Sequence, residues 1–329
     1  MKIGILGGGS WGTAMAYSLS RKHDIIIYIR NEDDANFLNE KHENKKYLKG
    51  KKLPENIRAS ADILEVLNQP IVINAIPTQQ IRSVLEKNAR DFKEDTIIVN
   101  LSKGLENKTY KRISEIFKEF LPANRFVALS GPSHAEEVIL DMPTSLVASS
   151  LDENAARTIQ KEFMSDSLRI YTNDDLIGVE LGSAVKNVLA LGIGIIDGLG
   201  YGDNPKAALM TRGIHEMVRF SVAMGGKRNT LYGLTGLGDL IVTATSRHSR
   251  NRLAGELIGK GHTLEDLSGE INMVVEGITT AKALYEMSEK EEIYMPITKE
   301  INALVYEGQD ISTAADNLMN KAEKEEFDF

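Results

Sequence analysis

Short apolar runs alternate with segments of helical spacing through the first half of the chain. The apolar runs are rich in Val and Ile and lack strict alternation, which is typical of strands buried on both faces. With helical segments between them, they predict a doubly wound α/β domain of the Rossmann type. We expect strands at 2–6, 25–29, 71–75, 97–100, 126–129 and 144–148, and helices at 11–21, 32–40, 60–67, 79–90, 109–120, 133–139 and 152–164.

The pattern changes near residues 173–174. Beyond this point strand-like runs almost disappear, and apolar residues recur at helical spacing, with glycine-rich breaks at 198–202, 225–226, 233–238 and 259–261. The sequence therefore predicts two domains, an α/β domain over 1–174 and an all-helical domain over 175–329.

A glycine motif stands directly after the first predicted strand. It reads Gly7-x-Gly9-x-x-Gly12 and is followed by a helical segment. Strand, glycine turn and helix in this order indicate dinucleotide binding. The first glycine permits the turn, the second leaves room for the pyrophosphate, and the third lets helix and strand pack closely. The helix N-terminus would bind the phosphates.

Composition narrows the remaining choices. The chain has 329 residues, 42% hydrophobic residues, no cysteine and a formal net charge of −8. Disulfides and thiolate metal sites are excluded, and a cytoplasmic location is expected. No signal peptide is expected before the first strand, and the longest apolar stretch, 188–196, is too short to span a bilayer. The acidic balance argues against nucleic acid as a partner.

The end of the second strand bears on which cofactor binds. An acidic residue there would hold the ribose 2′-hydroxyl of NAD. The first polar residue is instead Arg30, whose guanidinium suits the 2′-phosphate of NADPH. Glu32 lies two residues further on, and Arg30 could equally be a solvated residue at a strand end. The sequence favours NADPH and leaves NADH open.

Two further strand ends are expected at the same edge of the sheet, at Asn74 and Asn100. Ligands of open α/β sheets lie beyond the carboxyl ends of the strands. Lys103, three residues after Asn100, would there face the nicotinamide or an anionic substrate. The alternative is a solvated lysine.

The helical half carries two charged residues on an apolar helix, Glu180 and Lys186, with Asn187 next to the lysine. A buried lysine near other cations has a lowered pKa, which suits acid–base catalysis. Gly182 would allow close approach by a cofactor or by another helix. The alternative for this segment is helix packing with a lysine that extends to solvent.

A basic cluster follows Asp239. Three arginines fall within residues 247–252, among serines and a histidine. Such a cluster suits a phosphate group, since arginine gives bidentate contacts and hydroxyls give further donors. Asp239 itself could accept a hydrogen bond from a substrate hydroxyl. The alternative is a basic surface loop.

Together these segments resemble the bacterial NAD(P)-dependent glycerol-3-phosphate dehydrogenases. The resemblance covers nearly the whole chain. The matching segments are Gly7-x-Gly9-Ser10-Trp11-Gly12-Thr13-Ala14, Ser102-Lys103-Gly104, Gly131-Pro132-Ser133, Glu180-Leu181 with Lys186-Asn187, Leu237-Gly238-Asp239-Leu240 with Thr243, Ser249-Arg250-Asn251-Arg252 and Val275-Glu276-Gly277.

The resemblance implies reversible hydride transfer from NAD(P)H to dihydroxyacetone phosphate. The product, sn-glycerol 3-phosphate, feeds glycerophospholipid synthesis. A homodimer is implied, and no metal is expected. By similarity Lys186 is the proton donor and acceptor, and Lys103 assists electrostatically, with Asp239 beside them. The implied substrate residues are Lys103, Gly131, Ser133, Lys186, Asn187, Asp239, Thr243, Ser249, Arg250 and Asn251; the implied cofactor residues are Gly7, Gly9, Ser10, Trp11, Gly12, Arg30, Lys103, Ala135, Arg250, Val274 and Glu276.

Two departures from the family pattern are visible. Gly8 stands where an alanine is usual, and His134 stands where an aromatic residue such as Phe is usual. We interpret His134 as a structural substitution. Two other functions stay open: a related reductase of the 6-phosphogluconate-dehydrogenase-like group acting on a hydroxy or keto acid, and a nucleotide sensor without catalysis.

Overall fold

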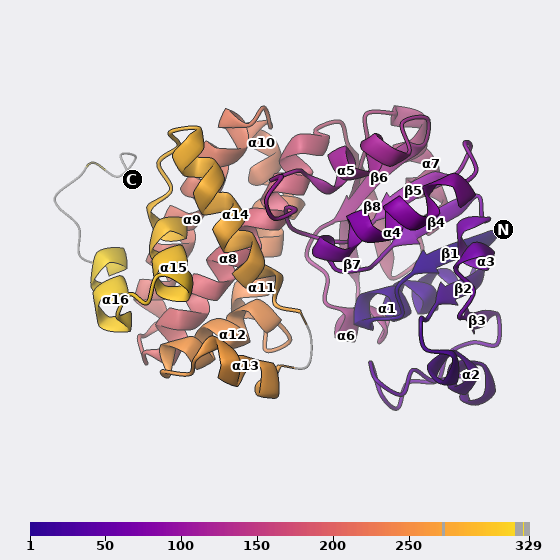
Figure 1. Cartoon of the computed structure of the whole chain (residues 1–329), viewed down its shortest axis with the longest axis horizontal. Helices are drawn as coiled ribbons and strands as arrows, with labels where there is room; N and C mark the ends of the chain where they lie inside the picture. The colour runs from indigo at the N-terminus through magenta and orange to yellow at the C-terminus, as the bar shows by residue number, and fades with distance from the viewer. Residues whose placement is uncertain (272–273, 320–324, 326–329) are drawn as a thin grey trace. The chain divides into compact units, whose positions relative to one another are not determined.

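The computed structural model describes residues 1–271, 274–319 and 325, which form two compact units (Figure 1). The first unit contains Met1–Ser102 and Ile113–Leu176. The second contains Lys103–Arg112 and Ile177–Phe329, so a ten-residue excursion of the first half of the chain belongs with the helical part. The expected division at 174/175 did not anticipate this excursion, and as a domain boundary it stays a prediction.

The first unit is built on an eight-stranded sheet in the order β3-β2-β1-β4-β5-β6-β7-β8. Neighbouring strands from β3 to β6 are parallel, whereas β7 pairs antiparallel with β6 and parallel with β8. The strands are β1 (Lys2–Leu6), β2 (Asp24–Tyr28), β3 (Ile57–Ser60), β4 (Ile71–Asn74), β5 (Ile97–Asn100), β6 (Arg125–Ser130), β7 (Thr144–Ser149) and β8 (Leu168–Asn173).

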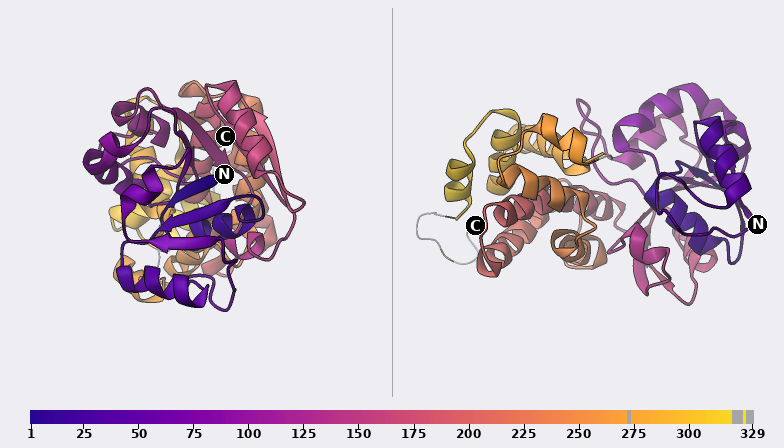
Figure 2. Two further views of the ribbon diagram at one scale, coloured as in Figure 1. Left: turned by 90° about the vertical axis from the view of Figure 1, so that its right-hand side faces the viewer. Right: turned by 90° about the horizontal axis from the view of Figure 1, so that it is seen from below.

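Helices cover both faces of this sheet (Figure 2). Buried residues of α1, α2, α6 and α7 pack with one face, and those of α3, α4 and α5 pack with the other. Ile25 and Ile27 of β2 join the first cluster while Ile26 joins the second, as the alternation of side chains along a strand requires. The helices are α1 (Ser10–Leu19), α2 (Glu32–Lys41), α3 (Ile63–Leu67), α4 (Ile81–Asn88), α5 (Ile113–Phe120), α6 (Ala135–Val138) and α7 (Glu153–Phe163).

The doubly wound α/β class predicted from sequence is confirmed, but β3 and β8 were not among the expected strands. They are the two edge strands of the sheet. Each alternates buried and exposed residues along its first half. Neither therefore forms the continuous apolar run on which the other strand predictions depend.

The helix expected at 109–120 begins later, at Ile113. Lys108 and Tyr110 have positive φ angles of 69° and 58°, which an α-helix cannot contain. Two other helices are shorter than expected. The helix expected at 60–67 starts at Ile63, because Ser60 ends β3 and Asp62 caps α3 by accepting a hydrogen bond from the Leu64 amide. The helix expected at 133–139 is the short α6, Ala135–Val138.

In the described residues of the second unit the regular secondary structure is all helical, as expected. Its elements are α8 (Leu176–Gly198), α9 (Asp203–Ala223), α10 (Arg228–Leu231), the π-turn η3 (Leu234–Gly238), α11 (Asp239–Thr245), α12 (Arg250–Gly259), α13 (Leu264–Glu270), α14 (Glu276–Lys290), α15 (Pro296–Tyr306) and α16 (Ile311–Met319).

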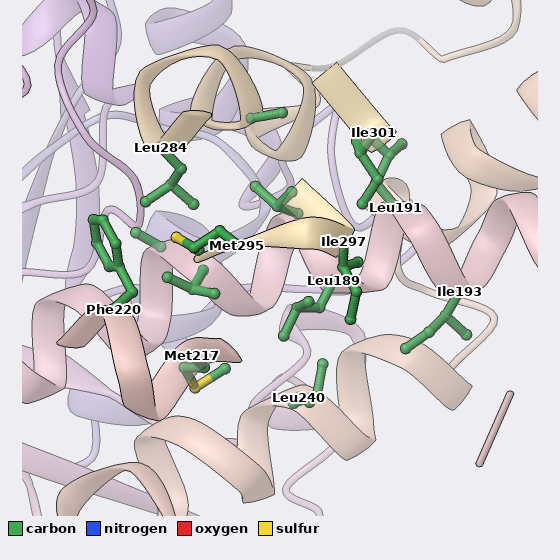
Figure 3. Packing of buried hydrophobic residues seen from close by; sticks show 14 of the residues in the cluster. Leu189, Leu191, Ile193, Met217, Phe220, Leu240, Leu284, Met295, Ile297 and Ile301 are labelled. Atoms are coloured by element: carbon green, nitrogen blue, oxygen red, sulfur yellow. The ribbon is translucent and has the colours of Figure 1, made fainter. Parts of the chain in front are cut away.

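Helix α8 is the centre of this unit. Its Leu189, Leu191 and Ile193 belong to one apolar cluster with residues of α9, α11, α14 and α15, several of which are drawn in Figure 3. A helix that is apolar on every side must be buried on every side. Its most apolar stretch is entirely buried, although the helix is long and apolar enough to cross a membrane. Helix α8 is longer than the apolar stretch 188–196, whose length was judged too short to span a bilayer. Its complete burial is typical of a core helix.

Glycines set the close crossing of α8 and α12. A Cβ on Gly194 would stand 2.1 Å from the Arg252 carbonyl oxygen, and one on Gly255 would stand 2.0 Å from the Leu191 carbonyl oxygen. Only hydrogen fits at these positions, so the two backbones touch. This contact fixes the start of α12 beside the middle of α8.

Candidate active site

Two lysines and a threonine of the second unit converge on the buried Asp239. This residue opens α11, directly after the π-turn η3. The π-turn lies against α8 at Gly182, where a Cβ would stand 2.9 Å from Leu231 Cδ1 and 3.2 Å from the Thr235 carbonyl oxygen. Of the two roles considered for Gly182, close approach by another helical segment is thus observed. Lys186 is one helical turn further along α8.

Two lysines bind the two oxygens of this carboxylate. Lys186 Nζ donates to Asp239 Oδ1 at 3.0 Å, and Lys103 Nζ donates to Asp239 Oδ2 at 2.6 Å. Thr243, one turn after Asp239, accepts a hydrogen bond from Lys186 Nζ at 2.7 Å and donates to Asp239 Oδ1 at 3.2 Å. Lys186 and Asp239 are 5% and 1% exposed, so this is a buried ionic cluster.

Burial and neighbouring charges set the protonation of the cluster. Burial lowers the pKa of Lys186 to about 8; the nearby Lys103 and Arg250 act in the same direction, and Asp239 opposes them. Burial alone would raise the pKa of Asp239, but the ammonium groups of Lys103 and Lys186 outweigh it and hold that pKa below its usual range. An ionised carboxylate therefore lies against a lysine that can exchange a proton near neutral pH.

A second polar chain runs beside this cluster. Asn251 Nδ2 donates to Asn187 Oδ1 at 2.9 Å, and Asn251 Oδ1 accepts from the Gly277 amide at 2.9 Å. The start of α14 at Glu276-Gly277 is thus linked through Asn251 of α12 to Asn187, the residue next to Lys186. The three motifs Lys186-Asn187, Ser249-Arg250-Asn251 and Val275-Glu276-Gly277 meet at one place.

The basic cluster predicted at 247–252 divides into separate parts. Arg252 turns away to an ion pair with Asp197 at 2.6 Å, and Ser249 caps α12 by accepting from the Arg252 amide at 3.2 Å. Arg250 is exposed and donates to the carbonyl oxygen of Val274 at 3.3 Å. Arg250 is thus a surface residue, while Arg252 holds the helices together.

The glycine motif in the first unit has the space that its sequence implied. Gly7 has a φ of 113°, and a Cβ on Gly12 would stand 2.1 Å from the Gly7 carbonyl oxygen. A Cβ on Gly9 would meet nothing within 4 Å, so the side that Gly9 leaves bare is open. Gly9 caps α1 without a side-chain hydrogen bond, and Ser10 and Trp11 follow in its first turn. This open turn at a helix N-terminus fits a dinucleotide pyrophosphate.

Gly8, where an alanine is usual in the family, has a neighbour that accounts for the difference. A Cβ there would stand 2.8 Å from Ile29 Cγ1. The Ile29 side chain fills the space that the alanine methyl group would need.

Cations gather after β2. Arg30 is exposed and its charge acts on Lys46. Lys45 and Lys46 both pair with Asp34, at 2.6 and 2.5 Å. Glu32, Asp33 and Asp34 open α2 beside these cations, so the surface carries charges of both signs.

Other predicted residues of the first unit lie at the end of β6. Gly131 has a φ of 146°, and its carbonyl oxygen accepts from the Ser133 hydroxyl at 3.0 Å. His134 is the N-cap residue of α6 and Ala135 begins that helix. Across residues 1–271, 274–319 and 325, no group of three or more His, Asp and Glu side chains is arranged to hold a metal ion. The expected absence of a metal stays a prediction.

Two family models cover almost all of the chain. The N-terminal model of NAD-dependent glycerol-3-phosphate dehydrogenase matches residues 2–156, and the C-terminal model matches residues 175–316. The chain belongs to the NAD-dependent glycerol-3-phosphate dehydrogenase family. Members of this family use NAD or NADP, as the glycine motif indicated.

Individual relatives match this chain over nearly their full length. The chain is 48% identical to glycerol-3-phosphate dehydrogenase [NAD(P)+] of Clostridium tetani, covering 98% of this chain and 93% of the relative. It is 48% identical to that of Thermoanaerobacter sp., covering 99% of each. The crystal structure of glycerol-3-phosphate dehydrogenase from Coxiella burnetii matches with a TM-score of 0.94 at 33% identity, covering 97% of this chain and 99% of that one.

A more distant likeness concerns the alternative function. A ketopantoate reductase from Ralstonia eutropha matches with a TM-score of 0.62 at 15% identity. This likeness is one of fold alone. The comparisons therefore favour the glycerol-3-phosphate dehydrogenases over the keto-acid reductases.

Proposed function

We propose that this protein reversibly reduces dihydroxyacetone phosphate to sn-glycerol 3-phosphate with NAD(P)H, supplying glycerophospholipid synthesis. The observation that carries the proposal is the buried Lys186 ammonium held by Asp239 and Thr243 beside Lys103. Membership of the family supplies the substrate and the reaction.

Lys186 is the proposed acid and base. Asp239 and Thr243 use two of the three N–H groups of its ammonium, and the third is proposed to reach the substrate oxygen. When bound, NAD(P)H would supply the hydride for the carbonyl carbon in the reduction. Lys186 then gives its proton to the developing alkoxide and becomes neutral, and in oxidation it takes that proton back. Lys103 keeps its positive charge and stabilises the oxyanion.

Asp239 is proposed to act by orientation and by charge. As the counter-ion of both lysines, it fixes the position of Lys186 Nζ and compensates for two buried positive charges. Its lowered pKa keeps it ionised throughout the working pH range, so it does not compete for the transferred proton.

The phosphate group of the substrate is proposed to bind a basic side chain of the helical unit. Arg250 supplies charge for the phosphate group, since the overall charge of the protein would repel an anion. The proposed substrate residues are Lys103, Gly131, Ser133, Lys186, Asn187, Asp239, Thr243, Ser249, Arg250 and Asn251.

The cofactor is proposed to bind along the glycine turn. NADPH is the preferred form, because Arg30 and the neighbouring lysines favour a 2′-phosphate, and NADH is also accepted. The proposed cofactor residues are Gly7, Gly9, Ser10, Trp11, Gly12, Arg30, Lys103, Ala135, Arg250, Val274 and Glu276.

A substrate panel tests this proposal. Purified protein is mixed with NADPH and either dihydroxyacetone phosphate or ketopantoate, and the product is identified chemically. We expect sn-glycerol 3-phosphate from the first and no turnover of the second. Turnover of the keto acid alone would replace the proposal with the alternative reductase, and NADPH binding without any turnover would favour a sensor.

We also propose a cytoplasmic homodimer, as in the family pattern. A chain without cysteine is compatible with a reducing compartment. Light scattering of the purified protein tests the dimer, and a mass of one 36.4 kDa chain would refute it.

A further inference from the structure

The segment Lys103–Arg112, here called the strap, is a ten-residue excursion into the helical unit. The residues on either side of it, Ser102 and Ile113, belong to the sheet unit. Lys103 is its first residue. The strap therefore carries one of the two buried lysines, although the sequence before and after it builds a different unit.

The strap is closed on itself by backbone hydrogen bonds. The Glu106 amide donates to the Lys111 carbonyl oxygen at 3.0 Å, and the Tyr110 amide donates to the Glu106 carbonyl oxygen at 2.9 Å. Thr109 adds a hydrogen bond from its hydroxyl to the Glu106 carboxylate. These bonds tie Glu106, three residues after Lys103, to residues 109–111 at the far end of the strap.

Besides Lys103, the side chains of Leu105, Arg112 and Tyr110 hold the strap to the helical unit. Leu105 is fully buried in the apolar cluster around α8. Arg112 Nη1 pairs with Glu180 Oε2 of α8 at 2.8 Å, and these side chains are only 17% and 6% exposed. Tyr110 donates its hydroxyl to Glu286 Oε2 of α14 at 3.0 Å. The two polar contacts lie at the end of the strap opposite Lys103.

We propose that Arg112 and Tyr110, anchored on Glu180 and Glu286, are positioning residues that hold Lys103 Nζ on Asp239 opposite Lys186. Through these anchors, contacts within the helical unit maintain the spacing of the three charged groups of the cluster. The inference rests on the proposed function, because it assigns these residues to the same reaction.

The charges around Lys186 predict how its pKa changes when Lys103 is displaced. The groups that face its ammonium are Asp239, Lys103 and Arg250. When Lys103 withdraws, Lys186 loses a repulsive neighbour, and Asp239 is left to interact with Lys186 more strongly. Both effects favour the charged form of Lys186, so its pKa rises. When the strap is loosened, the fall in the rate of reduction at alkaline pH should therefore shift to higher pH.

The first experiment compares Arg112→Gln with Arg157→Gln. Arg157 makes an exposed ion pair with Glu153 in the sheet unit, so it is a matched control for the same change. Arg112→Gln should lower kcat roughly 10- to 100-fold, since small misplacements of charged groups cost that much. The pH profile should shift to higher pH. Tyr110→Phe, which removes only a hydroxyl, should act in the same direction more weakly.

A double-variant cycle separates positioning from general destabilisation. In a Lys103→Met background, Arg112→Gln should cause little further loss of kcat, because the group it positions is already gone. Arg112→Lys should restore part of the activity. The proposal would be overturned if Arg112→Gln lowered kcat by the same factor with and without Lys103. It would also be overturned if the rates of Arg112→Gln equalled those of Arg157→Gln.

A readout without turnover separates this inference from the proposed function. Trace acylation of amines, followed by peptide mass spectrometry, measures the reactivity of Lys103 against the exposed Lys260 in the same sample. Arg112→Gln should raise the relative reactivity of Lys103, and an unchanged ratio would refute the positioning role. If the wild type fails to reduce dihydroxyacetone phosphate, the proposed function is wrong. The acylation ratio still tests whether Arg112 positions Lys103.

Discussion

Lys186 Nζ and Asp239 Oδ1 lie 3.0 Å apart, with both side chains almost fully withdrawn from solvent. Burial makes the ammonium easier to deprotonate, and the carboxylate limits that effect. The balance leaves a lysine with a pKa of about 8, whereas an ordinary lysine would remain charged well above this pH. This pair is the basis of the proposed proton transfer.

Replacing Lys186 with alanine should abolish proton transfer while leaving the cofactor site intact. We expect kcat to fall roughly 10²- to 10⁴-fold, the usual contribution of general acid–base catalysis. NADPH binding, followed by the fluorescence of the reduced nicotinamide, should be retained because the glycine turn lies in the other unit. Unchanged turnover would exclude Lys186 as the acid.

The pH dependence should have opposite signs in the two directions. Reduction needs protonated Lys186, so kcat/KM for dihydroxyacetone phosphate should fall as pH rises through about 8. Oxidation needs the neutral amine, so its kcat/KM should rise over the same interval. Initial rates in both directions check this. A reduction rate that stays constant to the usual pKa of lysine would contradict the assignment.

Arg30→Ala should weaken NADPH more than NADH. A hydrogen bond to a charged group contributes about 1.5–3 kcal/mol, which corresponds to a rise in the KM for NADPH of roughly 10- to 100-fold. The KM for NADH should hardly change. Arg58→Ala, at another exposed arginine of the same unit, is the control. Equal effects on both cofactors would remove Arg30 from the 2′-phosphate site.

Two glycines of the turn should respond differently to alanine. Gly9→Ala meets no atom within 4 Å, so the variant should fold with a nearly unchanged Tm and lose NADPH binding. Gly12→Ala places its methyl group against the Gly7 carbonyl oxygen, and overpacking of this kind costs about 1–3 kcal/mol. Thermal unfolding and NADPH titration separate the two effects. Tight NADPH binding by Gly9→Ala would contradict the assigned pyrophosphate position.

The sequence predicted the inner strands because they are buried on both faces and appear as continuous runs of Val and Ile. It missed the edge strands β3 and β8, which bury one face only. It identified Lys103, Lys186, Asp239 and Thr243 separately, and their hydrogen bonds with one another are long-range contacts that no local spacing contains.

The strap was missed for a related reason. Lys103 follows a strand of the sheet unit, so its position along the chain indicated a strand-end lysine. Its membership of the helical unit depends on Leu105, Tyr110 and Arg112, each of which contacts residues far away in the sequence. The positive φ angles of Lys108 and Tyr110 delay the start of the expected helix to Ile113, and neither residue type signals such a conformation.

The most direct test of the central claim is the oxidation of NADPH by the purified protein with dihydroxyacetone phosphate, run beside NADH. The account predicts rapid substrate-dependent oxidation, faster with NADPH than with NADH, and sn-glycerol 3-phosphate as the product. Folded protein that binds NADPH and oxidises neither cofactor with this substrate would contradict it.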